Sequence, residues 1–152
     1  MSLLNWKEIG IWVVIGLWFL SVSLPASLWY KTGQLHIPDY TQGTNPSIVY
    51  NGGPVRNFKG SYGAVVRSAK TGEIVAETPQ SSIFSYKPNA ARPDLLKLDW
   101  WVNSHEKTMN LPPGSYTMET CWTIRPPLFF LMNKYTCAES NIFTVAPNEG
   151  IQ

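Results

Sequence analysis

The hydrophobic pattern divides the chain into one long apolar run near the N-terminus and a series of short alternating segments after it. Residues 9–30 read IGIWVVIGLWFLSVSLPASLWY, which is 22 residues without a charged side chain. At 1.5 Å per residue such a helix is about 33 Å long and matches a bilayer hydrocarbon core of roughly 30 Å. The pattern therefore predicts a transmembrane helix within residues 1–30, with the lipid bilayer as the partner of residues 9–30.

Aromatic and basic side chains flank this apolar run on both sides. Trp6 and Lys7 precede it, and Trp29, Tyr30 and Lys31 close it or follow it. Amphipathic rings and the ends of lysine side chains favour the boundary between hydrocarbon and water. We therefore expect these five residues to lie at the two membrane surfaces.

A cleaved signal peptide is the alternative interpretation of the same segment. Its strongest apolar run, residues 9–20, is only 12 residues long and is followed by small residues and a proline. However, Lys7 is offset by Glu8, and cleavage after Ala26 would leave Leu24 at a position that requires a small residue. We expect an uncleaved signal anchor, and keep a secreted or virion-associated protein as the alternative.

The remainder of the chain has the pattern of an all-β domain. Residues 31–47 are rich in Gly, Pro and polar residues without sustained periodicity, which predicts a stalk. Over residues 48–147, short strand-like runs alternate with turn signals such as Lys70-Thr71-Gly72-Glu73, and residues 148–152 form a C-terminal tail. The 12 prolines lie mostly between these runs and argue against helices, so residues 98–102 are assigned to a strand.

The clearest alternation lies in the run that begins at Ser115. It places five residues on one face, which we expect to be the core face: Tyr116, Met118, Thr120, Trp122 and Ile124. The preceding segment Leu111-Pro112-Pro113-Gly114-Ser115-Tyr116 resembles the corner before the penultimate strands of immunoglobulin-like and fibronectin-type sandwiches, where a tyrosine hydrogen-bonds back to the chain. This resemblance implies an immunoglobulin-like antiparallel β-sandwich.

A wider resemblance covers most of the chain. The short N-terminal anchor followed by LDWW, LPPGSYTMETCWT and CAESNIFTV resembles small uncharacterised membrane-anchored proteins of tailed bacteriophages. It implies a phage-encoded membrane protein that acts at the host envelope. It brings no catalytic or binding residues to carry over.

Both cysteines lie in the domain, in runs that we expect to be neighbouring strands. A disulfide between Cys121 and Cys137 would close a 17-residue loop and contribute on the order of 3 kcal/mol. Disulfides persist in oxidising compartments, so this pairing predicts a periplasmic or extracellular domain. Two free buried thiols are the alternative. Because Cys121 stands five residues after Tyr116 instead of two, a disulfide here would join neighbouring strands and not the two sheets of a sandwich.

Charge and composition exclude several classes of function. The 12 Lys and Arg against 10 Asp and Glu give a net charge of only +2, which argues against a nucleic-acid partner. His36 and His105 are the only histidines and lie far apart in the sequence, and neither a phosphate-binding loop nor a metal motif is present. We therefore expect no enzyme activity, cofactor or metal. A carbohydrate-active domain that uses Asp94, Asp99 or Glu106 is the catalytic alternative.

Two features are candidates for recognition. An apolar loop includes Phe129, Phe130, Leu131 and Met132, and such a run covers the core, meets a partner or touches lipid. The pair Trp100 and Trp101 would point to opposite faces of a strand, so one ring is a candidate for exposure as a sugar platform or protein hot spot; alternatively, one ring fills the core and the other lies under a loop. The sequence thus predicts a membrane-anchored, extracytoplasmic, non-catalytic binding or structural module with a protein partner at the envelope and carbohydrate as a further possible ligand.

Overall fold

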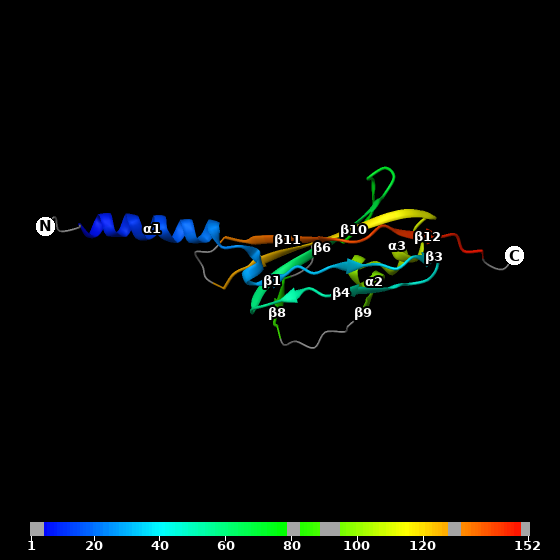
Figure 1. Cartoon of the computed structure of the whole chain (residues 1–152), viewed down its shortest axis with the longest axis horizontal. Coiled ribbons are helices and arrows are strands. Elements are labelled where there is room, and N and C mark those ends of the chain that lie inside the picture. The colour runs from blue at the N-terminus through cyan, green and yellow to red at the C-terminus, as the bar shows by residue number, and fades with distance from the viewer. Residues whose placement is uncertain (1–4, 79–82, 89–94, 128–131, 150–152) are drawn as a thin grey trace.

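The N-terminal helix projects from one end of a domain built mostly of β-strands (Figure 1). A computed structural model describes residues 5–78, 83–88, 95–127 and 132–149. The helical elements are α1 (Trp6–Ser23), the 3-10 turn η1 (Ala26–Leu28), α2 (Leu98–Val102) and α3 (His105–Met109). The strands are β1 (Tyr30–Lys31), β2 (Leu35–His36), β3 (Tyr40–Thr41), β4 (Ser47–Tyr50), β5 (Gly53–Pro54), β6 (Phe58–Ser68), β7 (Ile74–Glu77), β8 (Phe84–Tyr86), β9 (Leu95–Lys97), β10 (Gly114–Arg125), β11 (Lys134–Glu139) and β12 (Phe143–Ala146).

The long strand β10 lies at the centre of the larger sheet. It pairs antiparallel with β6 on one side, and on the other side with β12 near its start and β11 near its end. Strands β7 and β8 pair with opposite ends of β6, and β3 adds to β12 in parallel. A smaller sheet has the order β2-β4-β9, and β1 pairs with β5. Buried side chains from the larger sheet, from the smaller sheet and from α2 form one hydrophobic cluster.

The alternation predicted for β10 is confirmed. The side chains of all five expected core residues are 0–5% exposed, whereas Glu119 on the other face is exposed. The hairpin between β6 and β7 also forms where the turn signal predicts it. Gly72 has φ +73°, a conformation that glycine adopts without steric cost, and its N–H donates to the Ser68 carbonyl over 2.8 Å.

The first helix ends earlier than the apolar pattern suggests. Pro25 disfavours helical geometry at Leu24, which is extended with φ −71° and ψ 122°, so α1 stops at Ser23. Trp29 and Tyr30 were expected at a membrane surface, but they are buried in the domain, with 7% and 3% exposure. The 18-residue helix itself is apolar enough to span a membrane and is only 6% buried.

The segment for which the sequence predicts a stalk contributes to the folded domain. Leu35, Ile37 and Tyr40 are 4%, 0% and 8% exposed. Strand β2 pairs with β4, and β3 pairs with β12. Each strand is only two residues long, so no alternation long enough to recognise is present in the sequence. The domain therefore begins immediately after η1, without a flexible linker between it and the helix.

Residues 98–102 form the one-turn helix α2 and not the strand that their sequence suggested. Leu98, Trp101 and Val102 are buried, and their i, i+3, i+4 spacing places them on one helix face. Asn103, with φ 52°, ends α2, and the Ser104 hydroxyl caps α3 by accepting the Lys107 N–H over 3.2 Å. The apolar pattern spans a single turn, which is too short to distinguish from a strand by periodicity.

We expect Tyr116→Phe to destabilise the domain by about 1 kcal/mol. The Tyr116 hydroxyl donates a 2.5 Å hydrogen bond to the Pro112 carbonyl, which fixes the corner at the start of β10. Phenylalanine keeps the buried ring and removes only this bond. Chemical denaturation of the full-length protein in detergent, followed by circular dichroism, measures the change. Tyr135→Phe is the control, because Tyr135 is 68% exposed; equal stability of the two variants would contradict the role of the corner.

Candidate functional site

The two adjacent tryptophans of α2 have opposite environments. Trp100 is 51% exposed, whereas Trp101 is 4% exposed. Neighbouring residues on a helix are separated by about 100° around its axis, so a one-turn helix can bury one ring and present the other. One tryptophan is therefore exposed and the other buried, as one of the two alternatives predicted. The cause is a helix and not the strand that the sequence pattern suggested.

Trp100 is one end of an exposed aromatic row. Its ring is stacked on Tyr62 of β6, with centroids 5.7 Å apart and planes 12° apart. On the other side, Tyr62 lies 6.3 Å from the ring of Phe84 in β8, and Phe84 is 46% exposed. We call Tyr62, Phe84 and Trp100 the aromatic surface. The adjoining Ile83 is 50% exposed and extends its apolar character.

Core aromatic rings hold the aromatic surface from behind. Trp101 makes edge contacts with Tyr50 and Trp122, at centroid distances of 5.5 and 6.4 Å, and a further edge contact with Trp100 at 5.6 Å. The Thr78 hydroxyl donates to the Trp101 carbonyl over 3.0 Å and ties α2 to the chain that follows β7. Because α2 is fixed in this way, the exposed Trp100 ring is presented by a rigid element and not by a loop.

The polar residues next to Trp100 stabilise local structure. Hydrogen bonds from Asn45 and from His105 lower the pKa of Asp99, with the Asn45 bond the larger cause. His105 Nδ1 lies 3.0 Å from Asp99 Oδ2, and the Ser104 hydroxyl is used as the α3 cap. This arrangement is a histidine–carboxylate hydrogen bond beside a helix cap. Asp94, the third carboxylate considered for sugar chemistry, lies outside the described residues.

Tyr86 of β8 packs against β6. Its ring stacks on Phe58 at 4.8 Å and 15°. Burial, followed by the charge interaction with Tyr62, raises the pKa of Tyr86 to about 12. Its ring therefore contributes packing between β8 and β6, which supports the position of Phe84.

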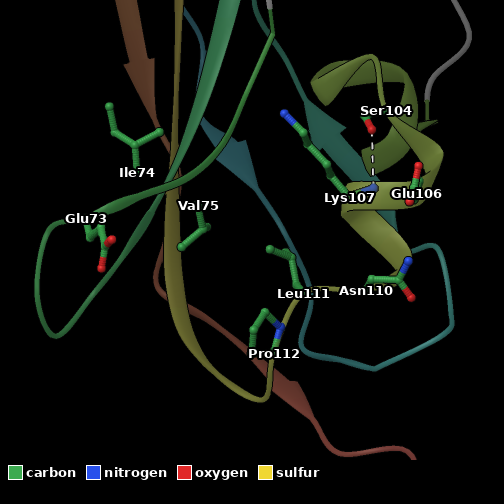
Figure 2. A pocket seen from close by; sticks show the side chains of 9 residues that line it. All are labelled: Glu73, Ile74, Val75, Ser104, Glu106, Lys107, Asn110, Leu111 and Pro112. Carbon is green, nitrogen blue, oxygen red and sulfur yellow. Dashed lines mark hydrogen bonds between the residues drawn. The ribbon is translucent and has the colours of Figure 1, made fainter.

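An open groove of about 580 Å³ lies between β7 and the segment that runs from α3 to Pro112 (Figure 2). The buried Leu111 lies at its floor, and Ile74 and Val75 form the β7 side. Glu106 and Lys107 supply charge from α3. These groups combine apolar and charged side chains without a pairing of nucleophile and base. Sequence reasoning missed the groove because its two walls come from segments about thirty residues apart in the chain.

The two cysteines form the disulfide that their positions predict. Cys121 and Cys137 are opposite each other in the β10–β11 ladder, with Cα atoms 4.0 Å apart. The disulfide lies on the outer face of the sheet, where Cys137 is exposed and Glu119 Oε1 is 3.7 Å from Cys121 Sγ. Both sulfur atoms belong to the disulfide, so Cys121 and Cys137 link the two strands covalently, and the Glu119 carboxylate lies beside this link.

The predicted interaction loop is only partly described. Phe129, Phe130 and Leu131 lie outside the described residues. Met132 is 57% exposed, and its N–H donates to Ser21 Oγ in α1 over 2.7 Å. Lys134 Nζ donates to the carbonyl of the same serine, and Ser21 is 1% exposed. The start of β11 is thus fixed against the last turn of α1, a contact between residues more than 110 positions apart that no local sequence pattern reveals.

No protein-family model matches the chain, and no curated protein is similar to it in sequence. The resemblances to immunoglobulin-like sandwiches and to membrane-anchored phage proteins therefore stay predictions.

Proposed function

We propose that this chain is a single-pass membrane protein whose extracytoplasmic β-domain binds a protein partner at the cell envelope without catalysing a reaction. The observation that carries the proposal is the aromatic surface of Tyr62, Phe84 and Trp100, which a rigid core presents on a domain joined directly to an apolar helix. Exposed aromatic rings with a fixed backing are typical of the residues that dominate binding at protein interfaces.

Two features support the membrane and compartment assignments. Most apolar side chains of α1 are exposed, which is unfavourable in water and favourable in a bilayer. The Cys121–Cys137 disulfide is typical of oxidising compartments and favours a domain outside the cytoplasm. Trp6 and Lys7 at the start of α1, and Lys31 after its end, remain our expected interface residues.

The proposal includes an immunoglobulin-like architecture for the domain. Its support is the antiparallel pairing around β10 and the Tyr116 corner, whose hydroxyl returns to Pro112. The origin in a tailed bacteriophage, with action at the host envelope, rests on the sequence resemblance alone.

The test is chemical cross-linking of full-length protein in the membranes of its native host. Membranes are washed with carbonate, and the intact mass of the recovered chain is measured before cross-linking. We expect the full-length mass and a cross-linked species with a partner, and we expect Trp100→Ala to reduce that species about tenfold or more, as loss of an interface hot spot does.

Ile142→Ala is the matched control, because Ile142 is 63% exposed and lies outside the aromatic surface. Its cross-linked species should equal that of the wild type. A mass lacking the residues up to Ala26 would replace the anchor by a signal peptide and favour the secreted or virion-associated protein. Equal cross-linking by the Trp100→Ala variant would refute the aromatic surface as the binding site.

Carbohydrate binding is the second candidate function, and the half-exposed Trp100 ring is the observation that favours it. A flat indole supported by Tyr62 offers the kind of apolar platform on which a sugar ring stacks. Sedimentation of the detergent-solubilised protein with insoluble cell-wall polysaccharide distinguishes the two candidates. Binding that Trp100→Ala abolishes would favour the carbohydrate function over the protein partner.

A further inference from the structure

The end of the domain next to α1 carries a concentration of positive charge. Six basic residues lie there, and we call them the basic end: Lys31, Arg56, Lys59, Lys87, Arg125 and Lys134. All of them except Lys134 are exposed to solvent. They come from five separate segments of the chain, so no run of basic residues in the sequence predicts this cluster.

The sheet register brings four of these residues together. At the end of β10, Arg125 is opposite Lys59 of β6, and the adjoining Ile124 is opposite Lys134 of β11. Phe58 of β6 is opposite Tyr86 of β8, which places Lys87 at the same end of the sheet. This is the end that contacts α1, because Lys134 bonds to the Ser21 carbonyl.

The chain that leaves α1 places the other two. Trp29 directly follows η1, and its carbonyl accepts the N–H groups of Val55 and Arg56 over 2.7 and 3.4 Å. Lys31 follows in β1, opposite Gly53 of β5. Arg56 and Lys31 therefore lie close to the helix exit. Figure 1 shows β1 at the same end of the domain as α1 and β8.

Carboxylates of the described residues lie elsewhere in the domain. On β10, Glu119 is six residues from Arg125, a separation of about 20 Å along an extended strand. Asp39 accepts the N–H of Thr144 in β12, and Glu73 and Glu106 line the groove beside α3. Strand β12 and helix α3 lie toward the end of the domain opposite α1 (Figure 1). Within the described ranges the one contact between a carboxylate and a basic side chain joins Asp99 and His105. Among the described residues, no carboxylate therefore pairs with the basic end.

We propose that the basic end binds the headgroups of anionic phospholipids in the leaflet from which α1 emerges. This inference rests on the proposed membrane anchoring. If α1 spans the bilayer, η1 is the only element between the helix and the buried Trp29, so the six cations are held near the headgroups. Each cation near an anionic surface is attracted to it, and the attraction decays within a Debye length of about 10 Å at moderate salt.

The contacts between α1 and the start of β11, which we call the helix junction, favour lipid as the partner of the basic end. Met132 and Lys134 bond to Ser21 and fix the orientation of β11 relative to α1, so the basic end faces the membrane persistently and not by occasional collision. Because α1 holds the basic end beside the membrane, the effective concentration of headgroups at this surface is high. Even weak binding sites for headgroups are then occupied. Selective contact with anionic lipid would set the tilt and height of the aromatic surface above the membrane.

The experiment reconstitutes the full-length protein in phosphatidylcholine bilayers that contain spin-labelled phosphatidylglycerol or spin-labelled phosphatidylcholine. Electron spin resonance measures the fraction of each labelled lipid that the protein immobilises. We expect phosphatidylglycerol to associate about threefold or more strongly than phosphatidylcholine at low salt. The preference should fall toward equality at about 1 M salt, where the Debye length is about 3 Å.

Two triple variants with the same change in net charge locate the effect. Arg56→Gln, Lys59→Gln and Arg125→Gln together remove half of the basic end, and we expect the lipid preference to be largely lost. The matched control replaces three cations away from α1: Arg67→Gln, Lys70→Gln and Lys107→Gln. It should keep the preference of the wild type. Near-ultraviolet circular dichroism confirms that each variant retains the wild-type tertiary structure.

The outcomes separate this inference from the anchoring on which it rests. Absence of immobilised lipid of either kind would show that α1 does not span the bilayer and would refute the membrane anchor. Immobilised phosphatidylcholine without an excess of phosphatidylglycerol would leave the anchor intact and overturn the basic end as a lipid site. An equal loss of preference in both triple variants would also overturn it, because net charge and not this surface would then be responsible.

Discussion

Trp122→Ala is expected to destabilise the domain by about 3–5 kcal/mol, the usual range for removing a buried aromatic ring. Trp122 is 4% exposed and lies on the core face of β10. Its ring is 4.6 Å from Tyr30, 5.4 Å from Tyr50 and 6.4 Å from Trp101. One side chain thus joins the larger sheet to the segment that leaves α1, to the smaller sheet and to α2, and its removal leaves a cavity that all three line.

Urea denaturation of the full-length protein in detergent, followed by far-ultraviolet circular dichroism, measures this effect. Natural domains are stable by only about 5–15 kcal/mol, so Trp122→Phe provides a milder variant if the alanine variant does not fold. We expect the phenylalanine variant to lie between the wild type and Trp122→Ala. The control is Trp100→Ala, which removes a ring that is 51% exposed and should change stability by about 1 kcal/mol or less. Similar losses in the two alanine variants would contradict a central role for Trp122.

The contrast between these tryptophans shows what a sequence pattern can predict. Trp122 belongs to a run of 12 residues in one strand, and alternation over that length places every side chain on its correct face. Trp100 and Trp101 belong to a helix of five residues. A single helical turn and a short strand have the same apolar signature, so the assignment of this segment depends on the tertiary contacts of Trp101 and Leu98 and not on local pattern.

The membrane-proximal region shows a different limit of the sequence. Residues 24–30 continue the apolar composition of α1, so Trp29 and Tyr30 look like the end of the span. Composition does not distinguish burial in lipid from burial in a protein core, because both environments favour the same side chains. The distinction comes from Pro25, which ends the helix, and from the contact of Tyr30 with Trp122, about ninety residues away. The basic end is equally non-local, since strand register assembles it.

The disulfide connects the fold to the proposed compartment, and its loss is expected to destabilise the domain by about 3 kcal/mol, as for other loops near the 16-residue separation of these cysteines. Among the described strands, β11 pairs only with β10, so the Cys121–Cys137 link secures an edge strand whose start also holds α1 through Lys134. Reduction should therefore loosen the helix junction as well as lower the denaturation midpoint.

Denaturation with and without reductant, and of the double variant Cys121→Ala and Cys137→Ala, measures this contribution. The double variant should have the stability of the reduced wild type, and reductant should leave it unchanged, which separates the disulfide from other effects of the reagent. Hydrogen exchange at residues 132–136 should rise with reduction, because β11 then depends on its ladder with β10 and on side-chain contacts alone. Alkylation of both thiols in native membranes without reductant would contradict the disulfide and, with it, the argument that places the domain in an oxidising compartment.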